Sequence, residues 1–480
     1  MDINLYQTHI EIQPYELGSV PRLEKMLSKY DSVTHKYIPI GYYYEDNTLY
    51  IPRGVSLALL KQLFGCQITV SNRCDEYDRI PSYQSLYDAR DKIQEESIDF
   101  LTTKGDRFKK GFMYSQFGLN LDTGDGKTFC MISSIISLKI KSIIITHKES
   151  IKNQWEMSIL NMTDIPQDRI CNISSSSVIN KIMKNKIDAD IYLVNHQTLT
   201  SYARTNGWDS IRELFKKIRV GIKVVDESHK FFENSLMIDF FSNVYRSYYL
   251  TATFTRSDPK EVKIYKLAYS SLYRFGEETF NYEEKRKHIV FVVVYYHSKP
   301  SLQQLNSMST GYGFSSYRFI DYAIKEKDNT MMRVLEKIVD ETSHLEGKTL
   351  IISPKVESVE YIANYVKELT DKKVGTVHSK NSADINAKGR NSDIISSTIK
   401  SIGEGDDIKG LRVLINTEPI GSRALADQLR GRLREYSEND DTFMFHLVDT
   451  SIKESYVFLK RIMPVMKKKC KEIIITTMNI

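Results

Sequence analysis

A glycine-rich segment between an apolar run and a helix-like run carries the residues best suited to chemistry. It occupies residues 121–128 and reads L-D-T-G-D-G-K-T. Its glycines can adopt backbone angles that other residues avoid, so successive N–H groups can curl around a phosphate at a helix N-terminus, where the dipole favours an anion. The lysine adds a positive charge and the last threonine a hydroxyl suited to Mg²⁺. The pattern predicts a phosphate-binding loop, whose residues are Thr123, Gly124, Asp125, Gly126, Lys127 and Thr128.

The flanks of this loop have the required context, a strand before it and a helix after it. The run 112–121 is aromatic and aliphatic, and the run 129–138 is apolar without Gly or Pro. The strict pattern G-x-x-x-x-G-K-[ST] would place glycine at Leu121, so the match is incomplete. The alternative interpretation is an ordinary glycine-rich turn.

A pair of acidic residues follows a later apolar run. If the loop holds a nucleoside triphosphate, a carboxylate for Mg²⁺ should end a buried strand. The run Ile222–Val225 leads directly into D-E-S-H. We therefore predict that Asp226 and Thr128 hold Mg²⁺, and that Glu227 orients or deprotonates an attacking water. His229 could sense the γ-phosphate, whereas a solvated strand end is the alternative.

A cluster of guanidinium groups lies late in the chain. Residues 428–434 read Q-L-R-G-R-L-R on a helix-like segment. A guanidinium that reaches the γ-phosphate accelerates hydrolysis strongly. We predict Arg432 in this role and Gln428 in positioning, with a basic surface helix as the alternative.

Length and alternation of elements predict two α/β domains in tandem. At 480 residues the chain exceeds what one core usually organises. Strand-like runs alternate with helix-like stretches, which is typical of parallel sheets. A small α+β module is expected before about Arg90. The predicted boundaries are 1–90, 91–285 and 286–480.

Composition bounds the class of protein. With 41% hydrophobic and 27% charged residues the chain is globular, and a net charge of +6 permits a polyanionic partner without requiring one. Five scattered cysteines favour a reducing compartment over a zinc site or disulfide framework. A polar, acidic start and the lack of a long apolar run favour a soluble intracellular protein with no membrane partner.

Taken together, these segments resemble the superfamily-2 helicases and translocases, over roughly residues 111–435. The match covers ordered motifs: 121–128, 146–148 with 154–155, 195–199, 226–229, 251–253, 353–355, 377–379, 398 with 403–407, and 428–434. The family's last motif usually reads Q-x-x-G-R-x-x-R, but here Glu435 takes the place of its final arginine and Arg434 stands one residue early. The resemblance implies two RecA-like domains that close on ATP and Mg²⁺.

The same resemblance implies roles for further residues. Those implied to grip a nucleic-acid backbone are Thr146, His147, Lys148, Asn195, His196, Ser353, Lys355 and Thr398. Those implied to couple hydrolysis to domain movement are His229, Thr251 and Thr253. Arg434 is a candidate second phosphate contact, and Gln84 is a weaker candidate for reading adenine.

Within the superfamily, the segments D-E-S-H, T-A-T and Q-L-R-G-R-L-R-E resemble the XPB/UvsW-like DNA translocases, and among them the poxvirus DNA helicases that release transcripts. That resemblance implies sequence-independent DNA binding, DNA-dependent ATP hydrolysis and 3′-to-5′ unwinding. It also implies transcription termination, with a viral RNA polymerase and nascent RNA as partners, in the cytoplasmic viral factory and the virion. An RNA helicase of the DExH type, a non-catalytic polymerase-associated factor and a small-molecule P-loop kinase are the alternatives.

Overall fold

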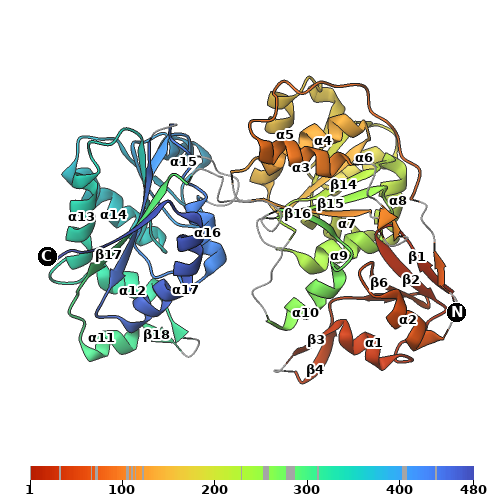
Figure 1. Cartoon of the computed structure of the whole chain (residues 1–480), viewed down its shortest axis with the longest axis horizontal. Helices are drawn as coiled ribbons and strands as arrows, with labels where there is room; N and C mark the ends of the chain where they lie inside the picture. The colour runs from red at the N-terminus through yellow and green to blue at the C-terminus, as the bar shows by residue number, and fades with distance from the viewer. Residues whose placement is uncertain are drawn as a thin grey trace. The chain divides into compact units, whose positions relative to one another are not determined.

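The computed structural model of the chain forms two compact units, Met1–Asn281 (unit 1) and Tyr282–Ile480 (unit 2) (Figure 1). It describes residues 2–31, 34–65, 68–70, 74–103, 108–109, 112–113, 115–121, 124–228, 230–251, 259–276, 287–310, 313–402, 408–437 and 440–479. Each unit is built around one seven-stranded parallel sheet with helices on both faces. The predicted pair of α/β domains is thereby confirmed.

Short apolar runs such as S-I-I-I-T form the sheet of unit 1, and they are buried on both faces as parallel strands require. In spatial order its strands are β12 (Ile170–Ile173), β13 (Ile191–Asn195), β11 (Ser142–Thr146), β14 (Ile222–Val225), β15 (Arg246–Thr251), β10 (Gln116–Asn120) and β16 (Tyr273–Gly276). One face is covered by α3 (Lys92–Thr102), α4 (Lys127–Leu138) and α5 (Glu149–Met162). The other is covered by α6 (Ser176–Met183), α7 (His196–Asn206), α8 (Asp209–Ile218), α9 (Phe232–Phe240) and α10 (Pro259–Ala268).

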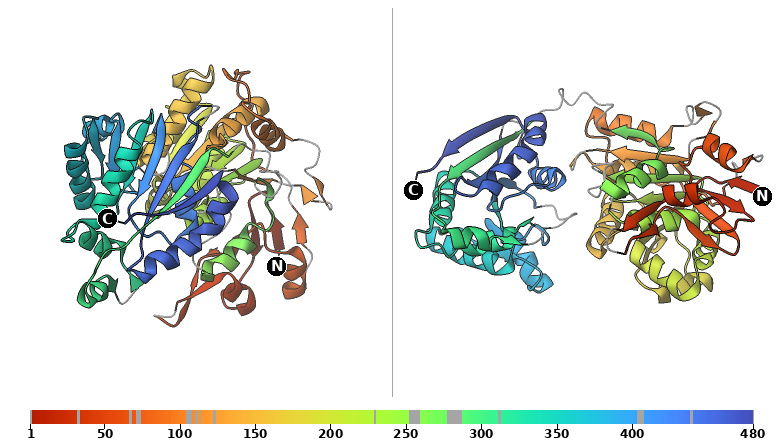
Figure 2. Two further views of the ribbon diagram at one scale, coloured as in Figure 1. Left: turned by 60° about the vertical axis from the view of Figure 1, so that its left-hand side comes forward. Right: turned by 90° about the horizontal axis from the view of Figure 1, so that it is seen from below.

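A small α+β module precedes this sheet, as predicted. Its sheet has the order β5 (Tyr43–Glu45), β6 (Thr48–Pro52), β2 (His9–Gln13), β1 (Asp2–Leu5) and β7 (Ile68–Val70), antiparallel except for the β1–β7 pair. It also contains α1 (Pro21–Met26), α2 (Leu57–Phe64) and a hairpin of β3 (Ser28–Asp31) and β4 (Lys36–Pro39). Within unit 1 the module packs directly on the part that holds the parallel sheet (Figure 2), where Tyr50 contacts the ring of Phe241 at 5.2 Å between centroids.

Unit 2 repeats the parallel design. In spatial order its strands are β21 (Val374–Val377), β22 (Ile394–Ser397), β20 (Lys348–Ile352), β23 (Leu411–Asn416), β24 (Thr442–Asp449), β17 (Ile289–Tyr296) and β25 (Glu472–Thr477). One face carries α12 (Ser316–Ala323), α13 (Thr330–Glu341) and α14 (Val356–Leu369), and the other carries α16 (Arg423–Arg430) and α17 (Lys453–Lys469). The polar stretch 298–316 contains α11 (Leu302–Ser307) and a small hairpin, β18 (Ser309–Thr310) with β19 (Gly313–Phe314). The remaining helix, α15 (Ala383–Arg390), follows β21.

Candidate nucleotide and nucleic-acid sites

The predicted phosphate loop joins the carboxyl end of β10 to the first turn of α4. Gly124 and Gly126 adopt positive φ angles of 103° and 84°, and Gly126 is the N-cap of the helix. Lys127 begins α4, and its Nζ donates to the carbonyl of Leu121 at 2.7 Å, so the ammonium lies over the loop. Thr128 follows in the same turn and is half-buried. Thr123 lies outside the described residues.

Helix α3 supports this loop from behind, through a residue that the sequence did not single out. The side-chain Nε2 of Gln94 donates to the carbonyl of Asp125 at 3.2 Å, and its Oε1 accepts from the Arg90 N–H at 2.9 Å. A Cβ on Gly126 would lie 2.3 Å from the same Nε2, and the φ of 84° independently favours glycine there. A signal for Gln94 existed in the sequence, because Asp91 caps α3 and fixes which face of the helix carries that glutamine.

Gln84, the candidate for reading adenine, lies elsewhere. Its N–H donates to Asp164 at 2.7 Å, and the adjacent Ser85 bridges Thr163 just beyond α5. Helix α5 starts at the carboxyl end of β11 and runs back across the sheet, so its far end lies at the amino edge. The phosphate loop lies at the carboxyl edge, and the structure therefore does not bring Gln84 to the loop.

The predicted acidic pair lies at the same carboxyl edge as the loop, two strands away. Asp226 follows β14, and its Oδ2 accepts from the indole N–H of Trp155 at 2.8 Å. Glu227 has a φ of 48°, the left-handed region that non-glycine residues rarely adopt. Such strain persists only where the surroundings over-determine it, and it concentrates at functional sites. Trp155, which belongs to a segment implied to grip nucleic acid, instead serves this carboxylate.

The electrostatics of Asp226 connect it to the phosphate loop. Burial raises the pKa of Asp226, and the neighbouring Glu227 charge raises it further. The Trp155 N–H and the Lys127 charge oppose that rise in pKa. Lys127 is thus close enough to the carboxylate for their charges to interact, as residues around one Mg²⁺-bound triphosphate must be.

The described residues fit a nucleotide-bound Mg²⁺ and no self-sufficient metal centre. Among them, no group of three or more His, Cys, Asp and Glu side chains could hold an ion. Mg²⁺ usually takes one or two protein oxygens and completes its shell with phosphates and water. The hydroxyl of Thr128 and the carboxylate of Asp226 are donors of that kind.

Two histidines implied to contact nucleic acid are buried behind an exposed ring. His147 and His196 follow β11 and β13, and burial lowers the pKa of each to about 4. The Phe231 ring lies 4.1 Å from the ring of His196 and 6.1 Å from that of His147, between centroids, and it remains 38% exposed. Both histidines are therefore neutral at physiological pH, and Phe231 is the part of this cluster that faces solvent.

The other residues of these two motifs bond to one another. Thr146 Oγ1 donates to Asn195 Oδ1 at 2.7 Å, and Asn195 Nδ2 donates to Glu149 at 2.8 Å. Thr146 and Asn195 are buried, whereas Lys148 is exposed at the start of α5. The buried side chains of Thr146 and Asn195 join the ends of β11 and β13, and the exposed Lys148 places a positive charge at the surface beside them.

Of the implied coupling residues, Thr251 alone lies among the described residues, because His229 and Thr253 fall outside them. Thr251 is buried at the end of β15, opposite Asn120 in the register of β10. One residue earlier, the carbonyl of Leu250 accepts from the Ser228 N–H at 3.1 Å. The turn that carries the acidic pair is thus tied to the strand that leads into the T-A-T segment.

In unit 2 the arginine cluster straddles the end of a helix. Helix α16 ends at Arg430, so Arg432 and Arg434 lie in the turn beyond it, where the sequence predicted continued helix. Arg430 is buried and pairs with Asp427 at 2.8 Å, which gives it a structural role. Gln428, Arg432 and Arg434 are half-buried.

The other motif residues of unit 2 are engaged within that unit. Ser353 is buried and shares a hydrogen bond with Ser358 at 2.6 Å. Lys355 donates from Nζ to Asp321. Thr398 Oγ1 donates to Ser401 at 2.8 Å and closes the turn after β22. Lys355 is half-buried, so it retains some solvent exposure from which to meet a phosphate.

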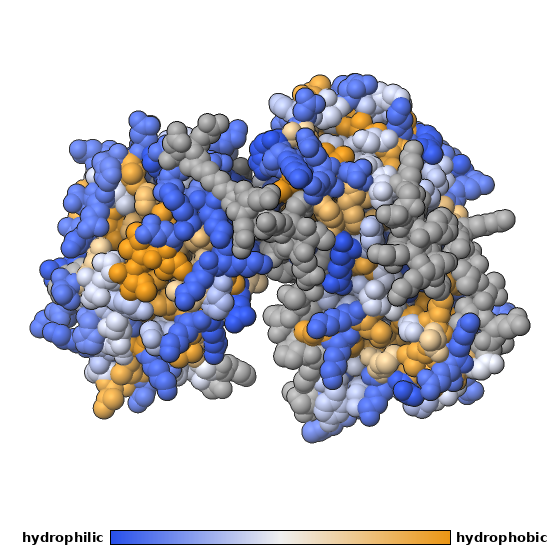
Figure 3. All heavy atoms as spheres, viewed as in Figure 1, coloured by the Kyte–Doolittle hydropathy of each residue, from blue (hydrophilic) through white to orange (hydrophobic). Residues whose placement is uncertain are grey.

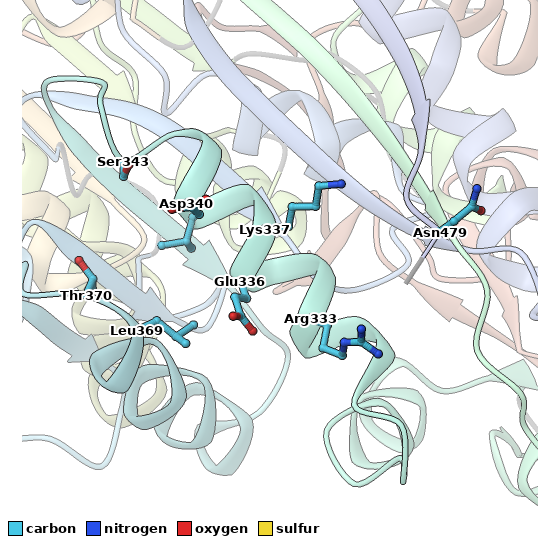
Figure 4. A pocket seen from close by; sticks show the side chains of 9 residues that line it. Arg333, Glu336, Lys337, Asp340, Ser343, Leu369, Thr370 and Asn479 are labelled. Atoms are coloured by element: carbon cyan, nitrogen blue, oxygen red, sulfur yellow. The ribbon is translucent and has the colours of Figure 1, made fainter.

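A hollow on unit 2 is separate from all of these residues. It encloses about 480 Å³ beside α13 and α14, and Figure 4 shows side chains of both charges around it. Its charged lining consists of Arg333, Glu336, Lys337 and Asp340. No motif residue lines it, and its mixed charge gives no preference for an anion.

Part of unit 1 matches a known family. Residues 85–256 match the family model described as the type III restriction enzyme, res subunit. No curated protein matches the chain. Within the described residues, no helix combines the length and the apolar character needed to cross a membrane.

Similar solved structures are found at low sequence identity. Dbp5 of S. cerevisiae bound to RNA and ADP BeF3 has a TM-score of 0.53 and 13% identity, over 81% of this chain and 89% of that chain. A single-residue variant of Dbp5, also bound to RNA and ADP BeF3, has a TM-score of 0.52 and 14% identity over the same shares. T4 UvsW aligns over 100% of both chains with a TM-score of 0.37 and 15% identity. The match within unit 1 and the two parallel sheets agree with the helicase-like fold of the Dbp5 structures.

Proposed function

We propose that this protein is an ATP-driven motor that moves along or unwinds nucleic acid, with DNA as its strand. The observation that carries the proposal is the meeting of three features at one edge of the unit 1 sheet. These are the glycine loop before α4, the ammonium of Lys127 over that loop, and the Asp226–Glu227 pair whose electrostatics include Lys127. A small-molecule kinase would share these features but would not account for a second α/β unit with an arginine cluster.

The residues of unit 1 divide the work of hydrolysis. The N–H groups of the loop and Lys127 bind the phosphates and oppose the charge that develops on them. Thr128 and Asp226 would hold Mg²⁺, which would supply positive charge to neutralise the phosphates. Glu227 orients the attacking water and takes its proton. Arg432 is the proposed guanidinium for the γ-phosphate.

DNA as the strand, 3′-to-5′ movement and a role in releasing transcripts are the finer parts of the proposal. The motif resemblance to XPB/UvsW-like translocases supports them. RNA is the alternative strand, and the fold likeness to Dbp5, whose structure contains RNA, supports its inclusion in the test. A 2′-hydroxyl contact is what separates the two.

The test is ATP turnover with single-stranded DNA, duplex DNA and RNA at one salt concentration. We expect DNA to stimulate turnover. Lys127→Ala should lower ATP turnover at least about a hundredfold. Glu227→Gln should bind ATP but hydrolyse little of it. Lys216→Ala, which removes a surface lysine of α8, is the matched control. Turnover at the parental rate in either site variant would overturn the assignment, and stimulation by RNA alone would overturn the choice of strand.

A further inference from the structure

The β3–β4 hairpin of the N-terminal module presents two tyrosines to solvent. All four residues of β4 are exposed, which is unusual for a strand. Tyr30 and Tyr37 stand directly opposite each other and are 41% and 46% exposed. Their ring centroids are 5.2 Å apart at an interplanar angle of 57°. Tyrosine rings of this kind, apolar on the face and polar at the hydroxyl, are common at binding interfaces.

The surroundings of this pair are cationic. Lys25 Nζ lies 5.1 Å from the centroid of the Tyr37 ring, and Lys36 and Arg22 are exposed nearby in the chain. The Tyr30 hydroxyl shares a hydrogen bond with His35 Nδ1 at 3.1 Å. In Figure 3 the lowest part of unit 1, where Figure 1 draws this hairpin, shows hydrophilic surface in blue, with an orange patch farther up. Aromatic rings among cations suit a polyanion with flat bases.

The carboxylates of this region already have partners of their own. Asp31 accepts from the hydroxyl of Thr34 at 2.6 Å. Glu24 accepts from the Tyr15 hydroxyl and from the Gly18 N–H, each at 2.7 Å. The three exposed cations Arg22, Lys25 and Lys36 thus outnumber these two carboxylates, Asp31 lying opposite Lys36, so the hairpin keeps an excess of one positive charge.

The hairpin is held firmly and on the relevant side of unit 1. A Cβ on Gly41, at its base, would lie 2.7 Å from the Ile264 side chain, so hairpin and α10 are in close contact. Lys29 pairs with Glu261 in the first turn of α10 at 2.9 Å. Because α10 connects parallel strands β15 and β16, its first turn lies toward the carboxyl edge of the sheet. That is also the edge where β11 and β13 end.

We propose that Tyr30 and Tyr37 form a stacking site for the bases of single-stranded nucleic acid, with Lys25 and Lys36 on its backbone. Stacking on aromatic rings is tolerant of sequence, since every base has a flat face. The site would extend the strand contact of unit 1 beyond the ends of β11 and β13. It depends on the proposed function only in requiring that a nucleic-acid strand is a ligand.

The experiment measures binding of the full chain, without nucleotide, to fluorescein-labelled oligo-deoxythymidine and oligo-uridine at one salt concentration. Tyr30→Ala with Tyr37→Ala should weaken binding about tenfold, and the corresponding pair of Phe substitutions should retain it. Tyr456→Ala is the control, because Tyr456 is an exposed single ring with Lys460 at 4.6 Å. It should bind as the parent does. The two oligonucleotides show whether the site prefers deoxyribose or ribose strands.

Removing charge gives an independent readout. Lys25→Ala with Lys36→Ala should lower the slope of log affinity against log salt by about 1.4, since each lysine releases roughly 0.7 counterion from a single strand. Parental affinity in the alanine pair, or equal loss in the Tyr456 control, would overturn the site, as would loss in the Phe pair. If the parent binds neither oligonucleotide, the proposed motor function is overturned as well. If the alanine pair binds normally while Lys127→Ala still abolishes turnover, only the hairpin proposal is lost.

Discussion

Glu227 and Asp226 have unequal environments although they are neighbours. Asp226 accepts from a buried indole and has a raised pKa, whereas Glu227 sits on a strained backbone in the turn that follows β14. Environment rather than residue type separates the roles of such pairs. Asp226, which is held in place by the indole, is suited to bind a metal. Glu227, which is carried by the strained turn, is suited to orient the attacking water.

Trp155→Phe should change the pKa of Asp226, the proposed Mg²⁺ ligand, while leaving its carboxylate in the site. Loss of the N–H donor should raise the pKa of Asp226 further, because that hydrogen bond favours the ionised form. The acid limb of the ATPase pH profile should move to higher pH, and Mg²⁺ affinity should fall about tenfold. Trp208→Phe, in the same unit, is the control. An unchanged acid limb would show that the indole has only a packing role.

The buried histidines predict how unit 1 responds to acid. The pKa of His196 is about 4 in the fold against 6.5 for a free group, so the unfolded chain binds more protons between these values. The free energy of unfolding should therefore be unaffected by this histidine above pH 6.5 and should fall as the pH falls from 6.5 toward 4. At pH 5 His196 lowers the free energy of unfolding by about 2 kcal/mol relative to neutral pH. Hydrogen exchange of β13 in His196→Asn should lose less protection between pH 7 and pH 5 than the parent, while His35→Asn should behave as the parent.

At the scale of elements, the loop depends on how α3 meets α4. Gln94 fills the space above Gly126 and bonds to the loop carbonyl. Removing this amide leaves the Asp125 carbonyl without that donor, and a lost buried hydrogen bond costs about 1–3 kcal/mol. The shape of the phosphate loop is thus set by a helix that ends well before it.

Gln94→Ala should raise the ATP concentration needed for half-maximal turnover about tenfold, because the loop loses its support. Gln84→Ala is the matched control, since Gln84 lies at the opposite edge of the sheet and should leave that concentration unchanged. Steady-state ATPase measurements on both variants decide the matter. The reverse pattern would restore Gln84 as the nucleotide-binding glutamine.

The elements predicted from sequence were those with strong local signals. The run I-I-I of β11 and the glycines of the phosphate loop needed no tertiary information. Strand β22 has a weak local signal because I-I-S-S is half polar, and its serines donate to neighbouring backbone, such as Ser397 to the carbonyl of Val377 at 2.6 Å. Helix α17 contains Pro464, which argues locally against a helix. The burial of His147 and the contact of Gln94 with the phosphate loop depend on packing between distant segments, and the Asp91 cap indicates only the face of α3 on which Gln94 lies.

At the scale of the molecule, the N-terminal module is part of unit 1 and not an appendage. Tyr50 packs on Phe241, and Arg212 of α8 pairs with Glu11 at 3.3 Å. Below this contact, buried Lys223 bonds to Asp239 at 2.5 Å, and the Tyr249 hydroxyl donates to the same carboxylate at 2.7 Å. Asp239 belongs to α9, whose Phe240 packs on Tyr50 of the module at 6.4 Å between ring centroids, so the strand that leads into the acidic pair is bonded to a helix that contacts the module.

Tyr50→Ala should destabilise unit 1 as a whole. The side chain is 8% exposed, and truncating a buried aromatic residue costs about 3–5 kcal/mol. Hydrogen exchange should lose protection in β14 and β15 as well as in the module, and unit 2 should keep its protection. Tyr37→Ala, at an exposed position, is the control. Loss confined to the module would show that the two parts fold independently.

The bond between Trp155 and Asp226 also gives the molecule an intrinsic optical probe. The chain has two tryptophans, and one of them donates to the carboxylate proposed to hold Mg²⁺. Indole emission responds to the charge beside its N–H. Arrival and departure of the metal–nucleotide complex can therefore be followed by ultraviolet fluorescence in the unlabelled protein, with Trp208 as a constant background.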